Sequence, residues 1–357
     1  MSTQHSRERV LAAIRREIPD RVPVSLAYEF IDDLCITRGK PQYVGRFKQD
    51  ERKVSFKRID NNVVNRNRFH LYLPNLPKEA VVNDWGYGAV HSSTKSSFKL
   101  IHPLLGLQKV RELKDYPFPN MMESWRHKSL EKEINRLHEQ GFAVQGAMSQ
   151  TVFEQAWHLR GMEQLFIEFF LNKEFASSLF DIITEVRCKM AKRFVKAGVD
   201  ILRLGDDIGS EKGMLMSPAT WREWLKPRLK RVIDAAKEID PEIPIFYHSD
   251  GDLREVIPEL IEIGVTILNP VQPECMNPEE LKKKYGDKLS FWGTIGTQTT
   301  MPFGKPEDVK RAVKKSIQTV GRGGGLVISP THSIEKDVPW ENIVALFEAV
   351  EQFGYYK

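Results

Sequence analysis

Cysteine and long apolar segments are scarce in this chain. Its 357 residues include only three cysteines, Cys35, Cys188 and Cys275, and no Cys-x-x-Cys pair. Three scattered thiols exclude a disulfide framework. No apolar run approaches the ~20 residues that a bilayer-spanning helix needs, and the polar N-terminus lacks the apolar core of a signal peptide. We therefore expect a protein of the reducing cytoplasm without a membrane partner.

A strong excess of one charge is also missing. The 53 basic and 48 acidic residues leave a net charge of +5, and both signs are mixed along the chain. The basic clusters at residues 7–21 and 222–231 are typical of solvated helix faces, so we expect no nucleic-acid partner. Hydrophobic residues make up 41% of the chain, which is usual for a soluble globular protein.

Short apolar runs alternate with longer helical segments from residue 123 onward. Such runs predict buried parallel strands, and a further run at residues 22–28 adds one more near the N-terminus. The pattern predicts one α/β domain over residues 1–357, a TIM-type (β/α)8 barrel with an N-terminal helical extension. The six predicted strands in the regular part are residues 142–148, 201–205, 244–247, 265–269, 289–293 and 325–329.

The segment before this regular part has a different composition. Residues 30–57 have a helical pattern, whereas residues 61–116 are rich in Asn, Ser and β-branched side chains and predict an inserted β-rich excursion. We expect the missing eighth strand between residues 60 and 100. A doubly wound open sheet is the main alternative, but no Gly-x-Gly-x-x-Gly follows any strand, which argues against a dinucleotide-binding fold.

One predicted strand ends in His248-Ser249-Asp250-Gly251. Residues i and i+2 of a strand point to the same side, so His248 and Asp250 can face one pocket, with Gly251 in the turn. An imidazole beside a carboxylate is half of a metal site or an acid–base pair. The structural alternative is a hydrogen bond that caps the end of the strand.

Other polar groups also follow predicted strands. In a parallel barrel the carboxyl ends of all strands meet at one mouth, where active sites lie. We therefore assign these groups to one site, with a catalytic set, a substrate-binding set and a metal-binding set. The catalytic set is Asp206, Asp207 and His248; the substrate-binding set is Gln150, Glu154, Trp157 and Gln272; the metal-binding set is His248, Asp250 and His332, with Cys275 as a reserve ligand.

Each of these residues has a structural alternative. Asp206 and Asp207 can cap the next helix, and Glu154 can lie near a helix start because the helix dipole favours a negative charge there. A lone cysteine such as Cys275 is usually a small buried hydrophobe, and a lone His332 is usually hydrogen-bonded in its loop. Their shared position after strand ends favours the site.

Several stretches together resemble the uroporphyrinogen decarboxylase-like superfamily, over nearly the whole chain. The resemblance implies a TIM-like barrel, in agreement with the strand pattern. The stretches are Arg7-Glu-Arg-Val-Leu-Ala-Ala, Pro19-Asp-Arg-Val-Pro23, Gly205-Asp-Asp-Ile-Gly209, His248-Ser-Asp-Gly251, Gly264-Val-Thr-Ile-Leu-Asn-Pro-Val-Gln272, Phe291-Trp-Gly293 and Pro339-Trp-Glu-Asn-Ile343.

The superfamily contains two chemistries. Its decarboxylases use no metal and bind an acidic tetrapyrrole with an N-terminal arginine-rich motif, which residues 27–34 lack. Its corrinoid-dependent methyltransferases hold zinc with a His-x-Cys motif and a later cysteine. This sequence keeps His248, but Asp250 and His332 stand where the cysteines would be.

The resemblance therefore implies Zn²⁺ and a corrinoid (cobalamin) carried by a partner protein. Asp and His make the metal harder than thiolates do, which favours an oxygen leaving group. We expect methyl transfer from a small methylated substrate, such as an aryl methyl ether, by O-demethylation. A homodimer is compatible with the sequence. The alternatives are a metal-free decarboxylase of another carboxylated substrate, with Asp206 or Asp207 as acid–base, and a non-catalytic binding barrel.

Overall fold

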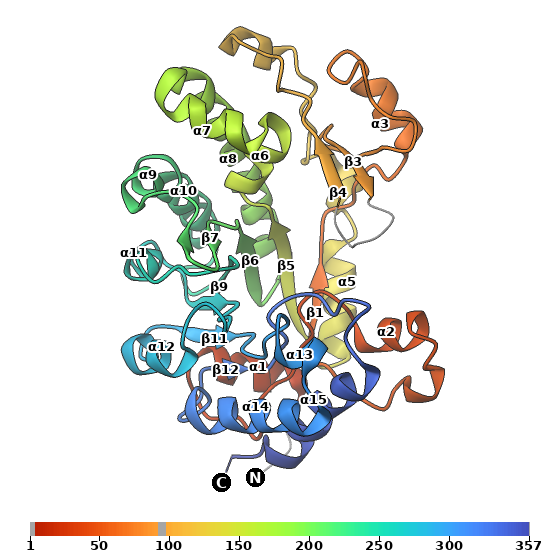
Figure 1. The fold of residues 1–357 in the computed structure, drawn as a ribbon, viewed down its shortest axis with the longest axis vertical. Coiled ribbons are helices and arrows are strands. Elements are labelled where there is room, and N and C mark those ends of the chain that lie inside the picture. Colours follow the sequence, from red (N-terminus) through yellow and green to blue (C-terminus); the bar gives the residue numbers. More distant parts are fainter. Residues whose placement is uncertain (1–3, 92–97, 357) are drawn as a thin grey trace.

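A curled sheet of seven parallel strands forms the centre of the molecule (Figure 1). The computed structural model describes residues 4–91 and 98–356. Neighbouring strands follow chain order, as expected when each strand is followed by a crossover. The strands, in sheet order, are β1 (Glu51–Val54), β5 (Ala143–Ser149), β6 (Ile201–Gly205), β9 (Ile245–His248), β10 (Ile267–Asn269), β11 (Ser290–Trp292) and β12 (Leu326–Val327). The six predicted strands of the regular part are confirmed.

Helices connect the strands and lie outside the curl (Figure 1). The largest contacts join α8 to α10 and α14 to α15, so neighbouring crossover helices pack on one another. Among the described residues, no helix combines the length and the apolar character that a bilayer crossing requires. The helices between β1 and the C-terminus are α3 (Asn62–Arg68), α4 (Ser124–His127), α5 (Leu130–Glu139), α6 (Phe153–Arg160), α7 (Met162–Leu171), α8 (Lys173–Lys196), α9 (Pro218–Trp224), α10 (Lys226–Lys237), α11 (Ile257–Glu262), α12 (Pro278–Tyr285), α13 (Thr300–Phe303), α14 (Pro306–Thr319) and α15 (Trp340–Phe353).

The N-terminal helix α1 (Ser6–Ile14) packs against the inside of the curl. Its buried side chains Val10, Ala13 and Ile14 join one cluster with a single residue from each of six strands. The strand residues are Ala143, Ile201, Phe246, Ile267, Trp292 and Val327. This cluster is separate from the larger core beneath the outer helices. It fills the amino-terminal end of the sheet, so the carboxyl end is left for a site.

The predicted first strand at residues 22–28 is only an isolated bridge. Val24 pairs in parallel with Ile328, and the Ser25 amide donates to the Ile328 carbonyl at 2.9 Å. The Asp50 amide donates to the Val24 carbonyl, also at 2.9 Å. This segment therefore lies between the two edges of the sheet, next to β12 on one side and the start of β1 on the other.

Two predictions for the N-terminal third are wrong. Residues 30–57 do not form one helix: they contain α2 (Ile31–Thr37), a 3₁₀ turn η1 (Pro41–Tyr43) and β1. The strand is not recognisable from the sequence because Arg52 and Lys53 are charged. In the structure the Arg52 guanidinium lies 3.9 Å from the centre of the Phe142 ring, and Lys53 Nζ donates to the Ala27 carbonyl at 2.5 Å. Long basic side chains bury their stems in this way.

The described residues of the segment 61–116 do not supply the eighth strand; residues 92–97 lie outside the described part. Among the described residues, its strands pair only with one another, in a small antiparallel sheet of β2 (Val81–Val82), β3 (Gly88–His91) and β4 (Phe98–Ile101). Helix α3 and a 3₁₀ turn η2 (Val110–Lys114) flank this sheet. A second small hairpin, β7 (Gly209–Ser210) with β8 (Gly213–Met214), follows β6.

A buried carboxylate joins the N-terminal segment to β1. Asp50 is fully buried and accepts hydrogen bonds from Arg9 Nη1 at 2.7 Å and Arg21 Nη1 at 3.0 Å. It also accepts from the Val24 amide at 2.9 Å and the Ser6 hydroxyl at 2.7 Å. A buried charge is tolerated when it is paired and hydrogen-bonded throughout, as here. Asp50 thereby connects α1, residues 21–24 and the sheet edge.

We expect the substitution Asp50→Ala to lower the free energy of unfolding by ~3–5 kcal/mol, because it leaves buried guanidinium groups without their shared partner. Urea denaturation of the full chain measures this. The control is Asp234→Ala, which removes an exposed ion pair with Lys230 and should cost less than ~1 kcal/mol. Equal losses from the two variants would contradict a structural role for the Asp50 network.

Candidate metal centre

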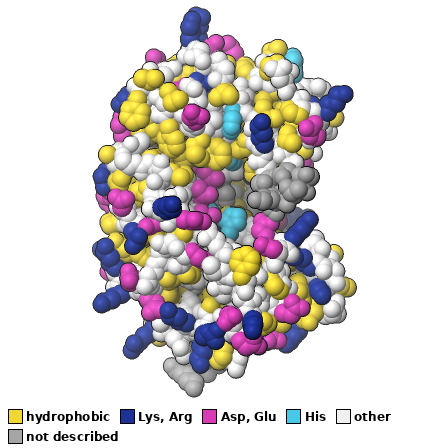
Figure 2. All heavy atoms as spheres, viewed as in Figure 1, with side chains coloured by type: hydrophobic (Ala, Val, Ile, Leu, Met, Phe, Trp, Pro, Cys, Tyr) yellow, Lys and Arg dark blue, Asp and Glu magenta, His cyan; other side chains and the backbone are white. Residues whose placement is uncertain are grey.

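Four neighbouring strands bring their carboxyl ends to the same level. Ser149 of β5 pairs with Gly205 of β6, Gly205 pairs with His248 of β9, and His248 pairs with Asn269 of β10. The groups that follow these strands therefore share one rim. Figure 2 shows a hollow in the middle of this face, in which acidic and histidine side chains are exposed.

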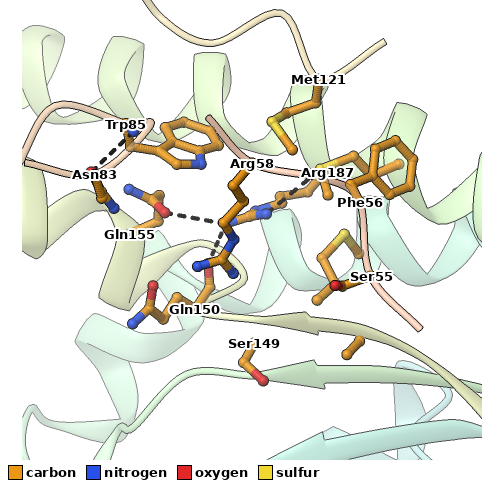
Figure 3. Close-up of a pocket in the computed structure, with 13 residues that line it drawn as sticks. Ser55, Phe56, Arg58, Asn83, Trp85, Met121, Ser149, Gln150, Gln155 and Arg187 are labelled. Atoms are coloured by element: carbon orange, nitrogen blue, oxygen red, sulfur yellow. Dashed lines mark hydrogen bonds between the residues drawn. The ribbon is translucent and has the colours of Figure 1, made fainter. Parts of the chain in front are cut away.

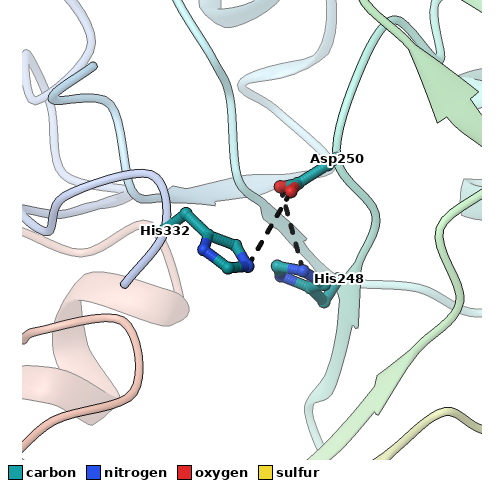
Figure 4. Close-up of side chains that lie close together, drawn as sticks. All are labelled: His248, Asp250 and His332. Atoms are coloured by element: carbon teal, nitrogen blue, oxygen red, sulfur yellow. Dashed lines mark ion pairs between the residues drawn. The ribbon is translucent and has the colours of Figure 1, made fainter. Parts of the chain in front are cut away.

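Three predicted ligands meet at this rim (Figure 4). One ligand atom from each of His248, Asp250 and His332 lies within 4.8 Å of the others. His248 Nε2 is 3.9 Å from Asp250 Oδ1, and His332 Nε2 is 3.9 Å from Asp250 Oδ2. The imidazole of His248 comes from the last residue of β9, and that of His332 from the segment between β12 and α15. The structure thus brings together the three residues that the sequence predicts as ligands.

Hydrogen bonds orient the His248 ring. Its Nδ1 donates to Asn269 Oδ1 at 2.6 Å, and Asn269 Nδ2 donates to the Trp292 carbonyl at 2.8 Å. Because Asn269 Nδ2 donates to the Trp292 carbonyl, Asn269 Oδ1 is the atom that faces His248. This oxygen can only accept a hydrogen bond, so the ring proton lies on Nδ1. The lone pair of Nε2 then faces the cluster, as a metal ligand requires.

The Tyr28 hydroxyl donates to His248 Nε2 at 3.0 Å and occupies this lone pair. The Tyr28 ring also packs against His332, with ring centroids 5.0 Å apart. Burial raises the pKa of Tyr28 above its ordinary value, so the hydroxyl keeps its proton and acts as a donor. Tyr28 therefore lies directly at the entrance to the three ligand atoms.

The protonation states of the cluster suit a cation. Burial lowers the pKa of both His248 and His332 below the ordinary 6.5, so both rings are neutral at pH 7. Burial raises the pKa of Asp250 to about 6, against the opposing effect of His248. Asp250 Oδ1 is buried and has no hydrogen-bond partner among the described residues. Two neutral imidazoles and an unsatisfied carboxylate oxygen fit Zn²⁺.

The two aspartates that follow β6 have different surroundings. Asp207 faces the cluster: its Oδ1 is 3.7 Å from His248 Nε2 and accepts from the Asp250 amide at 2.9 Å. Asp206 is buried and accepts from the Val152 and Glu154 amides at the start of α6, at 3.0 and 2.9 Å. Burial raises the pKa of Asp206 to about 7. These contacts of Asp206 are those of a helix cap.

Glu154 is a further carboxyl group at this rim, where α6 begins. Burial, followed by the charges of Asp207 and Asp206, raises the pKa of Glu154 well above its ordinary value. Asp250 acts in the same direction. A raised pKa favours the protonated form of a carboxyl group, which can donate a proton to a bound group.

The remaining predicted residues stabilise the rim or lie beside it. Gln272 Oε1 accepts from the Gly251 amide at 2.6 Å, which holds the turn after β9. Cys275 donates to the same oxygen at 3.6 Å and is not part of the three-residue ligand cluster. Trp157 packs edge-on against the His158 ring, and Gln150, at φ 58°, accepts from the Tyr87 hydroxyl at 3.3 Å.

Tyr28 and Asn269 both contact His248, and the sequence analysis did not assign either to the site. Each is the last residue of a predicted strand, 22–28 or 265–269. Reading the final residue of each strand, as well as the residues after it, would have found both. Their contacts with His248 across the rim are not visible in a local pattern.

Comparisons with known proteins agree with the resemblance. The chain is 28% identical to "Methylcobamide:CoM methyltransferase MtaA" of Methanosarcina barkeri over 173 residues, 48% of each protein. It is 24% identical to "Uroporphyrinogen decarboxylase 2, chloroplastic" of Oryza sativa subsp. japonica over 188 residues, 52% of this chain and 45% of the relative. The chain thus spans about half the length of the curated relatives it matches.

A solved structure has a similar fold. The "methyltransferase from Methanosarcina mazei" superposes with a TM-score of 0.64 at 20% identity, over 98% of this chain and 99% of that one. At this identity the likeness concerns the fold alone. The sequence model of uroporphyrinogen decarboxylase (URO-D) matches residues 111–353, well over half of the chain. The chain therefore belongs to the uroporphyrinogen decarboxylase family.

Proposed function

We propose that this protein is a zinc-dependent methyltransferase that moves a methyl group between a small methylated substrate and a corrinoid protein. The observation that carries the proposal is the cluster of His248, Asp250 and His332, with its unsatisfied carboxylate oxygen, at the carboxyl rim of the sheet. The similarity to a methylcobamide methyltransferase over half of the chain supports the same chemistry.

In this proposal His248 Nε2, an Asp250 oxygen and His332 Nε2 hold Zn²⁺, and Asp207 and Asn269 orient the ligands. Bound zinc supplies a Lewis acid that stabilises negative charge on a substrate oxygen. Imidazole and carboxylate make a harder site than thiolates, which supports an oxygen-linked methyl group, such as that of an aryl methyl ether.

The chain's own groups complete the reaction. In this reaction the carbon–oxygen bond of the methyl ether breaks and leaves its electron pair on oxygen. The methyl group passes to the partner's corrinoid in its reduced cob(I)alamin form, which supplies the electron pair of the new bond, and the departing oxygen gains a proton. Glu154, whose pKa is raised by burial and by the neighbouring carboxylates, is the proposed donor of that proton. Tyr28 packs against His332 and hydrogen-bonds to His248 Nε2, and in this proposal that hydrogen bond gives way when the metal takes the lone pair. The corrinoid is proposed to reside on a separate carrier protein.

The proposal includes a TIM-type barrel as a single domain over residues 1–357. The parallel sheet, the interior cluster with α1 and the bridging segment at residues 22–25 support it. The rival function is a metal-free decarboxylase with Asp206 or Asp207 as acid–base, and it differs from the proposal in its response to chelation.

We expect purified protein to retain zinc and His248→Ala to lose it, because this substitution removes a ligand whose orientation is already fixed. Elemental analysis before and after chelation measures retention, and methyl transfer from an aryl methyl ether to a corrinoid protein measures activity. The control is His70→Ala, an exposed histidine bonded to its own loop. Full activity in a metal-free preparation would contradict a role for zinc.

We expect zinc affinity to fall as pH decreases through about 6. Protons compete with the metal for its ligands, and burial raises the pKa of Asp250 to about 6, so that this ligand gains its proton in this range. Titration of zinc binding between pH 5 and 8 measures this. The variant Asp250→Asn should bind zinc weakly, and its zinc affinity should no longer change near pH 6. If the affinity of that variant still fell near pH 6, another group would control binding.

The substitution Asn269→Ala should lower zinc affinity ~10–100-fold, because His248 would lose the acceptor that fixes its tautomer and ring orientation. Competition with a chelator of known affinity measures the change. The exposed residue Asn75 provides a control, Asn75→Ala, which should bind zinc as the unmodified chain does. Unchanged affinity in Asn269→Ala would contradict the orienting role.

A further inference from the structure

The Tyr28 side chain contacts both histidines of the candidate metal centre. Its hydroxyl donates to His248 Nε2 at 3.0 Å, and its ring centroid lies 5.0 Å from that of the His332 ring. Tyr28 is nevertheless 37% exposed, so part of the residue is open to solvent. Tyr28 therefore lies where a molecule that approaches the three ligand atoms has to pass.

The backbone on both sides of Tyr28 is tied to the edge of the sheet. Tyr28 lies in a bend, outside any helix or strand. The carbonyl of Ala27 accepts from Lys53 Nζ at 2.5 Å, and the carbonyl of Glu29 accepts from Gln49 Nε2 at 3.0 Å. Because these two anchors hold the main chain, a movement of the hydroxyl has to come from rotation of the side chain.

Two cations also lie against the Tyr28 ring. Lys53 Nζ is 5.5 Å from the ring centroid, and the guanidinium carbon of Arg203 is 5.4 Å from it. Positive charges within about 6 Å of an aromatic face are attracted to it. These contacts do not involve the hydroxyl, so they keep the ring at the rim when the hydroxyl loses its partner.

A metal ion on the cluster has to displace the Tyr28 hydroxyl. Zinc binds an imidazole nitrogen at ~2.0–2.1 Å, along its lone pair. The hydroxyl now occupies that lone pair of His248 at 3.0 Å, so the two cannot be present together. Since the backbone and the ring are held, the displacement is short. The hydroxyl then stays beside the fourth ligand position, which three protein ligands leave open.

A neighbouring recess on the same rim does not offer an alternative place for a substrate. It lies beyond the end of β5, where Arg187 donates to the carbonyls of Gln150 and Thr151 at 2.7 and 2.9 Å (Figure 3). Its volume is about 20 Å³, which is room for about one water. Neither Tyr28 nor a candidate ligand is among its described lining residues. A substrate oxygen and the released hydroxyl therefore meet over the ligand cluster.

We propose that Tyr28 is a catalytic residue whose hydroxyl changes its partner: it caps His248 in the metal-free protein and donates a hydrogen bond to the departing oxygen of the substrate in the zinc-loaded protein. This inference rests on the proposed methyltransferase function. A hydrogen bond that strengthens as charge develops on the oxygen lowers the barrier to the reaction.

The hydroxyl of Tyr28 keeps its own proton throughout. When the carbon–oxygen bond breaks, its electron pair stays on the oxygen, and cob(I)alamin supplies the pair of the new bond to the methyl carbon. Glu154 supplies the proton that the oxygen finally gains. The departing oxygen has three lone pairs, so it can contact the metal, accept from Tyr28 and take this proton.

The substitution Tyr28→Phe removes the hydroxyl and keeps the ring. We expect it to bind zinc ~2–10-fold more tightly than the unmodified chain, because the ion no longer competes with a hydrogen bond for the His248 nitrogen. Competition with a chelator of known affinity measures this without any substrate. The matched control is Tyr355→Phe, at a residue that is 63% exposed, and its zinc affinity should be unchanged.

Weaker zinc binding in Tyr28→Phe would show that the tyrosine is itself a ligand and would overturn the inference. Unchanged zinc affinity would overturn the capping role. Tighter binding supports the cap, since a variant with a disturbed fold would lose affinity.

Calorimetric titration of the zinc-loaded chain with phenol and with toluene tests the second role. Phenol carries the oxygen that the reaction leaves behind, whereas toluene has the ring alone. We expect Tyr28→Phe to weaken phenol binding at least ~10-fold and to leave toluene binding unchanged, because hydrogen bonds to a charged oxygen are the strong ones. Equal phenol affinity in the two proteins, or no phenol binding at millimolar concentration, would overturn the catalytic role.

Methyl transfer separates this inference from the proposed function. We expect Tyr28→Phe to lower kcat ~10–100-fold with little change in KM, because the hydrogen bond matters most when charge has developed. Higher zinc affinity together with a lower kcat would support both roles of the hydroxyl. If the unmodified chain bound no zinc, the proposed function itself would be contradicted. Zinc binding and methyl transfer that are the same in Tyr28→Phe would support the function and overturn the inference alone.

Discussion

The register of four parallel strands at their carboxyl ends is the constraint on which the candidate site depends. Ser149, Gly205, His248 and Asn269 are direct neighbours across β5, β6, β9 and β10. A slip of one residue would turn every side chain of a strand to the other face of the sheet. A slip in β9 alone would remove His248 from Asn269 and direct its ring toward the outer helices.

The rim has an acidic part and a basic part, and neutral hydrogen-bonding groups orient the side chains in each part. On one side, the Trp292 carbonyl orients Asn269, and Asn269 orients His248 beside the carboxylates. On the other side, backbone carbonyls at the end of β5 hold the Arg187 guanidinium without neutralising it. Both groups are therefore preorganised while their charges stay available.

The sequence by itself determines the alternation of strands and the chemistry of the ligands. Buried parallel strands are short and continuously apolar, so the six runs between residues 142 and 329 stand out from the amphipathic helices. A strand has a side-chain period of two, which places His248 and Asp250 on one side without knowledge of the fold. His332 follows from the same reasoning, because the carboxyl ends of parallel strands meet.

Only the tertiary structure decides which of these groups act together. Arg52 lies in a strand because Phe142 covers its stem, and Asp206 caps α6 while its neighbour faces the histidines. Arg187 has the sequence surroundings of an ordinary helix residue and yet is a buried cation. Tyr28 and His248 are 220 residues apart and share a hydrogen bond. A local pattern records the period of apolar side chains, whereas burial and charge pairing depend on partners that only folding brings within a few ångströms.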